Sequence, residues 1–134
     1  MERNPGDPEL IRVAVCGAVR LAAVGRAASD IGTVRCAHDF LDHLVTGLPD
    51  DPLPRHAFAE ASVDLISAET RINGLSSALA VYRKVSRLGD AHADDAEYAG
   101  VRAKAAANLV ALALEAERPS DARRALSELA RLEA

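Results

Sequence analysis

The sequence predicts an all-α fold of about six helices, paired into three antiparallel hairpins, and three observations lead to this. The 134 residues include 28 alanines and 16 leucines but only four aromatic side chains. Alanine and leucine favour helices, whereas strands favour aromatic and β-branched residues. Segments rich in proline and glycine divide the chain into units of about 40 residues. A short apolar pattern also recurs once in each unit: Ala37, Leu41 and Leu44; Ala78, Tyr82 and Val85; Ala122, Leu126 and Leu129.

Helix packing explains this recurring pattern. Residues spaced i, i+4 and i+7 lie on one face of a helix. A small alanine at the first position allows two helix backbones to approach closely, and the larger pair fills the space beside it. Since a single hairpin buries only part of its apolar surface, units of this kind are expected to stack on one another.

The first two helices are expected at residues 8–30 and 33–46. Asp7, Pro8 and Glu9 suit a helix start, because Asp caps the first turn and proline fits its first position. The segment 30–33 breaks the helical pattern between the two. Three prolines within residues 47–54 then predict the end of the first hairpin.

Four more helices are expected at residues 55–72, 75–88, 94–117 and 119–132. Asn73 and Gly74 mark the turn within the second hairpin, and the segment 88–95 separates it from the third. Pro119 opens the last helix. The chain is thus predicted to be one domain, residues 1–134, with hairpins at about 8–48, 54–89 and 94–133.

Charge and composition limit the classes of function. The net charge is −4 with both signs interspersed, which argues against a nucleic-acid partner. No uncharged run reaches 18 residues, so no membrane partner is expected. Two cysteines, Cys16 and Cys36, are too few for a disulfide scaffold and suit a reduced, cytoplasmic protein.

The three units together resemble the tetratricopeptide repeat family. That family pairs two antiparallel helices, with a bulky residue, leucine-glycine and an aromatic residue in the first. A turn glycine follows, and then alanine, an aromatic residue and a further alanine in the second, with a closing proline. This chain has smaller or aliphatic residues at the bulky positions of the first unit. The first unit follows this pattern most closely, and the second and third lack the turn glycine. The matching positions of the first unit are Leu21, Val24, Gly25, Ala28, Gly32, Ala37, Leu41, Leu44 and Pro49. The resemblance implies a short right-handed superhelical stack.

The resemblance also implies a concave groove that binds a protein or peptide, lined by the first helix of each hairpin. The polar residues that map to this groove are Arg26, Glu60, Asp64, Ser67, Arg71, Lys104 and Asn108. Lys104 and Asn108 resemble part of a clamp for a C-terminal carboxylate, but Asp64 would repel such a ligand. The alternative is that all seven are ordinary solvated residues on helix faces.

Other chemistry receives little support from the sequence. Cys36, Asp39 and His43 share a helix face, but the outer two lie about 10 Å apart along it, which is too far for one metal ion. We therefore expect a buried Cys36 and a surface His43. No phosphate-binding glycine loop and no nucleophile with a neighbouring base stands out. We expect no cofactor and no enzymatic activity.

Two hypotheses about partners remain. The first is a non-enzymatic protein-binding module, and the alternative is a small helical regulator that contacts nucleic acid through Arg83, Lys84 and Arg87. The N-terminal helix has apolar residues spread around it rather than along one side. It is therefore expected to pack against the partner or against a second copy of the chain, which would give a homo-oligomer.

Overall fold

A computed structural model describes residues 7–116 and 118–133 of the chain, and this part folds into six α-helices. The predicted all-α fold is confirmed. The helices are α1 (Pro8–Ala27), α2 (Ile31–Gly47), α3 (Pro52–Ile72), α4 (Leu75–Ala91), α5 (Ala96–Leu114) and α6 (Pro119–Leu132).

Aspartates begin four of the helices. The side chains of Asp7, Asp30, Asp51 and Asp95 each accept a hydrogen bond from a backbone N–H in the first turn of α1, α2, α3 and α5. Such caps satisfy donors that have no partner inside the helix. At Asp30 the Thr33 hydroxyl, followed by the Thr33 backbone N–H, lowers the pKa of the carboxyl.

Four predicted helix limits differ from the structure by three residues, among them the ends of α1 at Ala27 and of α5 at Leu114, where helices to residues 30 and 117 were expected. Residue 117 itself lies outside the described residues.

The other two limits have a physical reason. Helix α3 begins at Pro52, inside the expected proline break, because proline is tolerated in the first turn where its missing N–H needs no partner. Helix α4 continues through Gly89 to Ala91. Gly89 packs closely against α5, since a Cβ at this position would lie 3.1 Å from the Tyr98 ring and 2.7 Å from the Arg102 guanidinium.

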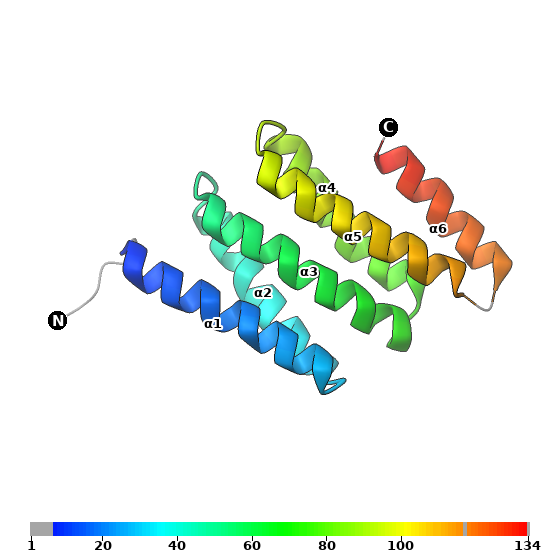
Figure 1. Cartoon of the computed structure of the whole chain (residues 1–134), viewed down its shortest axis with the longest axis horizontal. Coiled ribbons are helices and arrows are strands. Elements are labelled where there is room, and N and C mark those ends of the chain that lie inside the picture. Colours follow the sequence, from blue (N-terminus) through cyan, green and yellow to red (C-terminus); the bar gives the residue numbers. More distant parts are fainter. Residues whose placement is uncertain (1–6, 117, 134) are drawn as a thin grey trace.

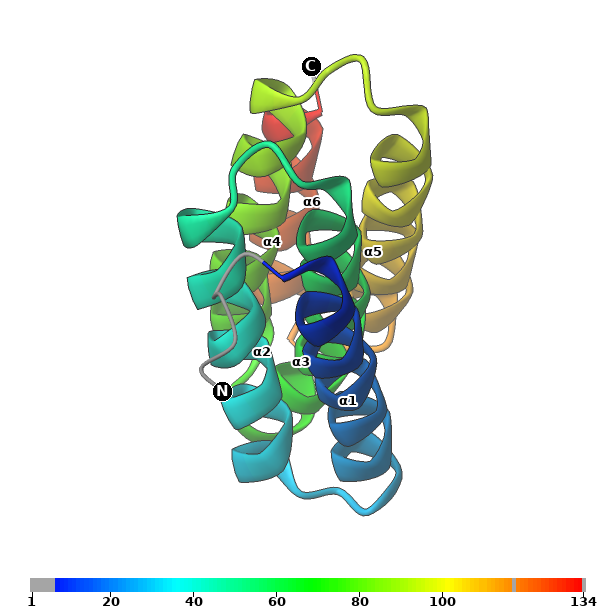
Figure 2. The ribbon, with the colours of Figure 1, turned by 90° about the vertical axis from the view of Figure 1, so that its left-hand side faces the viewer.

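The helices form two layers. Figure 1 shows α1, α3 and α5 side by side, with α2 and α4 behind them, and the view along the layers in Figure 2 separates the two sets. Helix α3 is central, packing against α1, α2, α4 and α5, while α6 packs against α4 and α5. Each helix therefore packs against the helices that precede and follow it in the chain.

Two layers place the connections on two edges of the molecule. The hairpin edge carries the connections within each pair: residues 28–30, residues 73–74 and the link between α5 and α6. The inter-hairpin edge carries residues 48–51 and 92–95 together with the end of α6.

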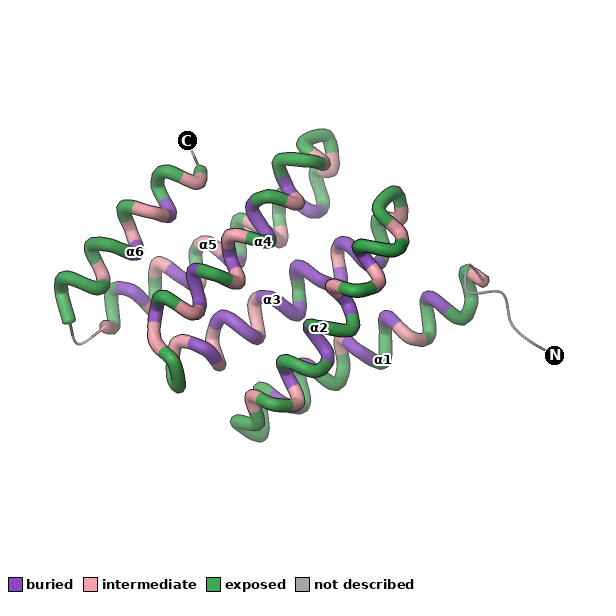
Figure 3. Tube along the Cα trace, turned by 180° about the vertical axis from the view of Figure 1, so that it is seen from behind, coloured by how far each residue is buried: buried purple, intermediate pink, exposed green. Residues whose placement is uncertain are grey.

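The core consists of two apolar clusters. One joins α1, α2 and α3 with Val85 and Tyr98, and the other joins α3, α4, α5 and α6. Figure 3 shows that the buried stretches lie on the helix sides that face neighbours. Among the described residues no helix combines the length and hydropathy needed to cross a membrane.

The burial predicted from the recurring alanine pattern is found in two of its three copies. Ala37 and Ala78 are buried at helix contacts, as expected. In α6 the buried pair is Ala125 and Leu129, whereas Ala122 is only half-buried, so the expectation for Ala122 was wrong. The true third copy starts three residues later than the sequence pattern indicated. Ile72, the last residue of α3, has an exposed side chain.

Candidate functional site

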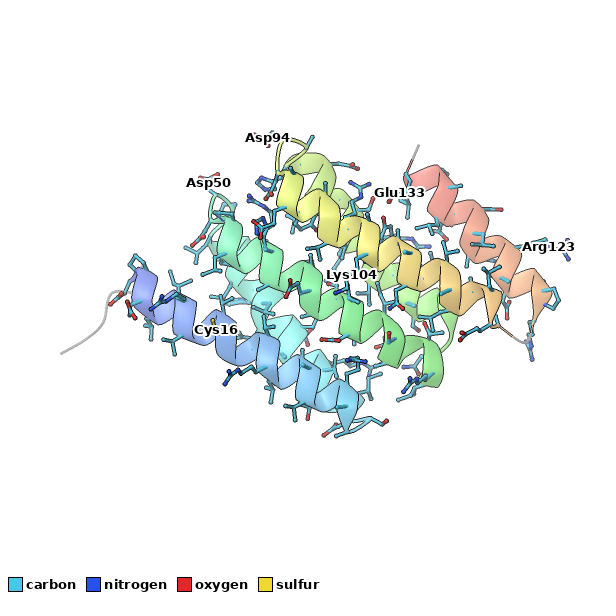
Figure 4. All side chains as sticks on the ribbon, viewed as in Figure 1. Cys16, Asp50, Asp94, Lys104, Arg123 and Glu133 are labelled. Carbon is cyan, nitrogen blue, oxygen red and sulfur yellow. The ribbon has the colours of Figure 1, made fainter. Side chains whose placement is uncertain are left out.

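The predicted binding residues lie on the outer side of α1, α3 and α5, which we call the α1/α3/α5 face. Arg26 on α1 donates across to Asp64 on α3, with 2.7 Å between Nε and Oδ1. Burial raises the pKa of the Asp64 carboxyl, and the charges of Arg26 and Lys104 oppose that shift. Figure 4 shows Lys104 on this face of α5. The structure thus brings three predicted residues from three helices together.

A second cross-helix contact ties Asn108 to α3. Its side-chain N–H donates to the hydroxyl of Ser67 at 3.0 Å. This bond uses one of the two N–H donors of the amide that a carboxylate clamp would need. Glu60 is exposed on the same face. Of the predicted half-clamp, Asn108 is therefore partly engaged within the protein, and Lys104 is exposed on the same face.

Arg71, the remaining predicted residue, lies at the hairpin edge and lines two pockets. The smaller pocket, about 120 Å³, lies between α1 and α3 and has an apolar part made by Ile31, Ala68 and Ile72. The larger, about 630 Å³, opens between the α3–α4 turn and the link from α5 to α6. Its charged lining residues are Arg71, Arg118, Arg124, Glu115 and Asp121. Arg71 is exposed, so a ligand in either pocket can reach it.

The inter-hairpin edge is held by a buried charge cluster that the sequence did not reveal. The Arg55 guanidinium donates to Asp95 Oδ2 through Nε at 3.1 Å and through a second nitrogen at 2.9 Å. His56 lies 2.7 Å from the same oxygen. The backbone N–H of Tyr98, followed by the His56 side chain, holds the pKa of the Asp95 carboxyl below its usual range.

A second arginine ties three helices at the same edge. Arg102 on α5 donates to Ser86 on α4 at 2.8 Å and to Asp90 at 3.1 Å. It also pairs with Glu133, just beyond the end of α6, at 3.3 Å, and Glu133 accepts from the Tyr82 hydroxyl. Burial, followed by the bond to Glu133, raises the pKa of Tyr82. These partners are 12 to 51 residues apart in the chain, so no local motif signals them.

One serine and one histidine do lie close together in the core, which the sequence did not indicate. His38 Nε2 is 2.9 Å from Ser62 Oγ, and the Ser62 hydroxyl donates to the carbonyl of Phe58 at 2.8 Å. Because that hydroxyl proton is engaged, His38 acts as the donor to Ser62, the reverse of what a general base needs. Burial lowers the pKa of His38 and keeps it neutral. Since both residues are buried, this is a structural hydrogen bond.

The basic cluster on α4 is largely engaged in contacts between helices. Arg83 pairs with Glu128 of α6, and Lys84 pairs with Asp42 of α2 at 3.1 Å. Lys84 and Arg87 also border a pocket of about 430 Å³ whose apolar lining includes Phe58 and Leu88. The cluster therefore presents less unpaired positive charge than its sequence suggests.

The cysteine-containing cluster on α2 differs from the prediction in one respect. His43 is exposed as expected, but Cys36 is exposed too, so the prediction that it is a buried side chain was wrong. Among residues 7–116 and 118–133, no three His, Cys, Asp or Glu side chains are placed to hold one metal ion.

Comparison of the chain with models of protein families, with curated proteins and with solved structures gives no match.

Proposed function

We propose that this protein is a non-enzymatic protein-binding module of the tetratricopeptide repeat kind. In this proposal the three hairpins form one superhelical stack, whose first helices are α1, α3 and α5. The side-by-side arrangement of those helices supports it, because they form one continuous surface. The cross-helix pairs Arg26–Asp64 and Ser67–Asn108 fix the side chains on that surface before any partner arrives.

The position of Arg71 carries the proposal. This exposed arginine borders both the small apolar pocket and the large polar one. A small pocket lined by Ile31, Ala68 and Ile72 suits one apolar side chain, and a guanidinium suits a carboxylate. We propose that an extended peptide lies along the hairpin edge, with an apolar anchor in the small pocket and an acidic group on Arg71.

Lys104 supplies a second cation for the same ligand. It lies on the α1/α3/α5 face, and its charge is near enough to Asp64 to affect that carboxyl. A peptide that continues from Arg71 across this face meets Lys104 on α5. Acidic peptides with an apolar residue next to the acid are therefore the expected ligand class.

A peptide library displayed on phage tests this function without knowledge of the native partner. Enriched peptides should carry an acidic residue beside an apolar one. Arg71→Glu should weaken their binding about tenfold or more in fluorescence anisotropy, since attraction becomes repulsion at a central contact. Arg123→Glu changes an exposed arginine on α6 in the same way and is the matched control.

Two results would overturn the function. One is a library that yields no peptide bound at the hairpin edge. The other is retention on duplex DNA that falls steeply with salt and is lost on substitution of Lys84 and Arg87, which would favour a nucleic-acid regulator.

A further inference from the structure

The first hairpin carries most of the large exposed hydrophobic side chains of the described chain. Five of the eight large exposed hydrophobic residues lie on α1 and α2. We call their common surface the end face, and it consists of Leu10, Val13, Gly17, Leu21 and Val24 on α1 and Phe40 on α2. The two helices that carry it, α1 and α2, are at the front of Figure 2.

Helix geometry places the α1 residues of the end face in one strip. They follow one another at spacings of three and four residues, which keeps them on one side of a helix. The buried residues of α1, such as Val15 and Ala22, point to α2 and α3 instead. Helix α1 thus has one apolar side in the core and a second apolar side in solvent.

The contact between Gly25 and Thr33 fixes where Phe40 lies along this strip. A Cβ at Gly25 would be 3.0 Å from the Thr33 side chain, so these two residues face each other across the hairpin. Phe40 is two turns beyond Thr33, and because α2 runs antiparallel to α1 it lies level with residues 17–18. Phe40, the largest exposed side chain of the end face, therefore lies level with Gly17, its smallest residue.

Gly17 makes a notch in the strip. A Cβ built at Gly17 meets no heavy atom within 4 Å, and Val13 and Leu21 stand one turn to either side of it. The end face thus combines a projecting aromatic ring on α2 with a gap on α1 at the same height. A surface that carries a projection and a matching gap can pair with a copy of itself.

We propose that the end face binds a second copy of this chain, as a twofold symmetric dimer. With the twofold axis parallel to the helices, α1 of one copy faces α2 of the other, and height along the helices is preserved. Each Phe40 then enters the Gly17 notch of the other copy. The same twofold operation places Arg20 of each copy beside Asp39 of the other. Because the axis repeats every contact, the dimer contains two such pairs of opposite charge.

The polarity of the two ends selects this pairing over head-to-tail stacking. The opposite end of the molecule is α6, whose outward residues include Arg123, Arg124 and Arg131, all exposed. Stacking the end face on α6 would cover these charges with apolar side chains, whereas pairing two end faces covers no charged residue of the strip. Closed dimers are therefore expected rather than filaments.

The size of the end face predicts a weak dimer. Five partly exposed large side chains amount to on the order of 400 Å² per copy, comparable with the largest apolar patch of a typical monomer. Two such patches, about 800 Å² together with a polar rim, fall at the low end of specific interfaces. The expected dissociation constant is therefore on the order of tens of micromolar.

Sedimentation velocity of the full chain from about 1 to about 500 μM tests this proposal. The expected result is a monomer–dimer equilibrium in which Gly17→Lys raises the dissociation constant at least tenfold, because the side chain fills the notch. Glycine is the poorest ordinary helix former, so this substitution should not weaken the fold. Leu114→Lys, at an exposed leucine on α5, is the control and should dimerise like the natural sequence.

Three outcomes would overturn the proposal: a protein that stays monomeric throughout, a Gly17→Lys variant that dimerises normally, or assembly into species larger than dimers. The peptide-binding proposal stands apart from this one, because it concerns the hairpin edge. Gly17→Lys should bind library peptides unchanged, so the two proposals can fail independently.

Discussion

Arginines have different surroundings at the two edges of this molecule. At the inter-hairpin edge, Arg55 is only 7% exposed and Arg102 is largely covered, and both bond to carboxylates on other helices or connections. At the hairpin edge, Arg71 is exposed between two pockets. Within the described residues no carboxylate pairs with it. Near the hairpin edge Arg26 and Arg35 do pair with Asp64 and Glu69, so Arg71 is the arginine there that is available to a ligand.

The two edges also differ in how firmly their connections are held. The ion pair between Arg55 and Asp95 holds the connection 92–95 against α3, and Asp95 also caps α5. The turn at 73–74, by contrast, contains Gly74 with a φ of 90°, and α4 has no side-chain cap. Rigidity at one edge therefore positions the helices whose other ends form the pockets.

Arg55→Ala should have the largest effect on folding. It removes the buried guanidinium that bonds the Asp95 carboxylate and the Pro49 carbonyl, so the loss should be several times that at an exposed arginine. Arg71→Ala should change the free energy of unfolding by less than about 0.5 kcal/mol, because its side chain is exposed. Urea denaturation measures both, and equal losses would remove the distinction between the two edges.

Ala78→Leu should have the next largest effect. Ala78 is fully buried in α4 beneath the hairpin edge, so a larger side chain overpacks the helix contact and costs about 1–3 kcal/mol. Ala122→Leu, at the half-buried position in α6, should cost less than that. The same denaturation experiment checks the order of the two. If Ala78→Leu left the free energy of unfolding unchanged, the core below the pockets would not be closely packed.

Acid should weaken the inter-hairpin edge, with little effect near neutral pH. The folded-state pKa of Asp95 lies below that of an unfolded aspartate, about 4, so the unfolded chain binds the proton first as the pH falls. The stabilisation is complete above about pH 5 and is lost as the pH drops below about 4. Asp95→Asn keeps a capping oxygen but cannot ionise, and its unfolding free energy should depend less on pH between 5 and 3. An identical dependence in both proteins would contradict this role of Asp95.

Features that depend on residues close together in the sequence were predicted best. Six helices, their turns and the capping role of Asp7 follow from local composition and spacing. The limits at Pro52 and Gly89 did not follow, because a proline in the first turn and a glycine packed on Arg102 look like breaks when read locally.

The candidate site was predictable only as a set of positions. Helix spacing, together with the family resemblance, placed Arg26, Asp64 and Lys104 on one face, and the structure does bring them together. Nothing in the sequence indicates that Asn108 is bonded to Ser67, or that Arg71 lies between two pockets. Those facts depend on how helices distant in the chain pack together.

The most direct test of the account is the affinity of one library-selected acidic peptide for three proteins: the natural sequence, Arg71→Glu and Arg123→Glu. Fluorescence anisotropy should give a dissociation constant that rises about tenfold or more for Arg71→Glu and stays within about twofold for Arg123→Glu. Circular dichroism should show the same helix content in all three. Equal affinities across the three proteins would contradict the claim that the exposed arginine between the two pockets is where this molecule binds its partner.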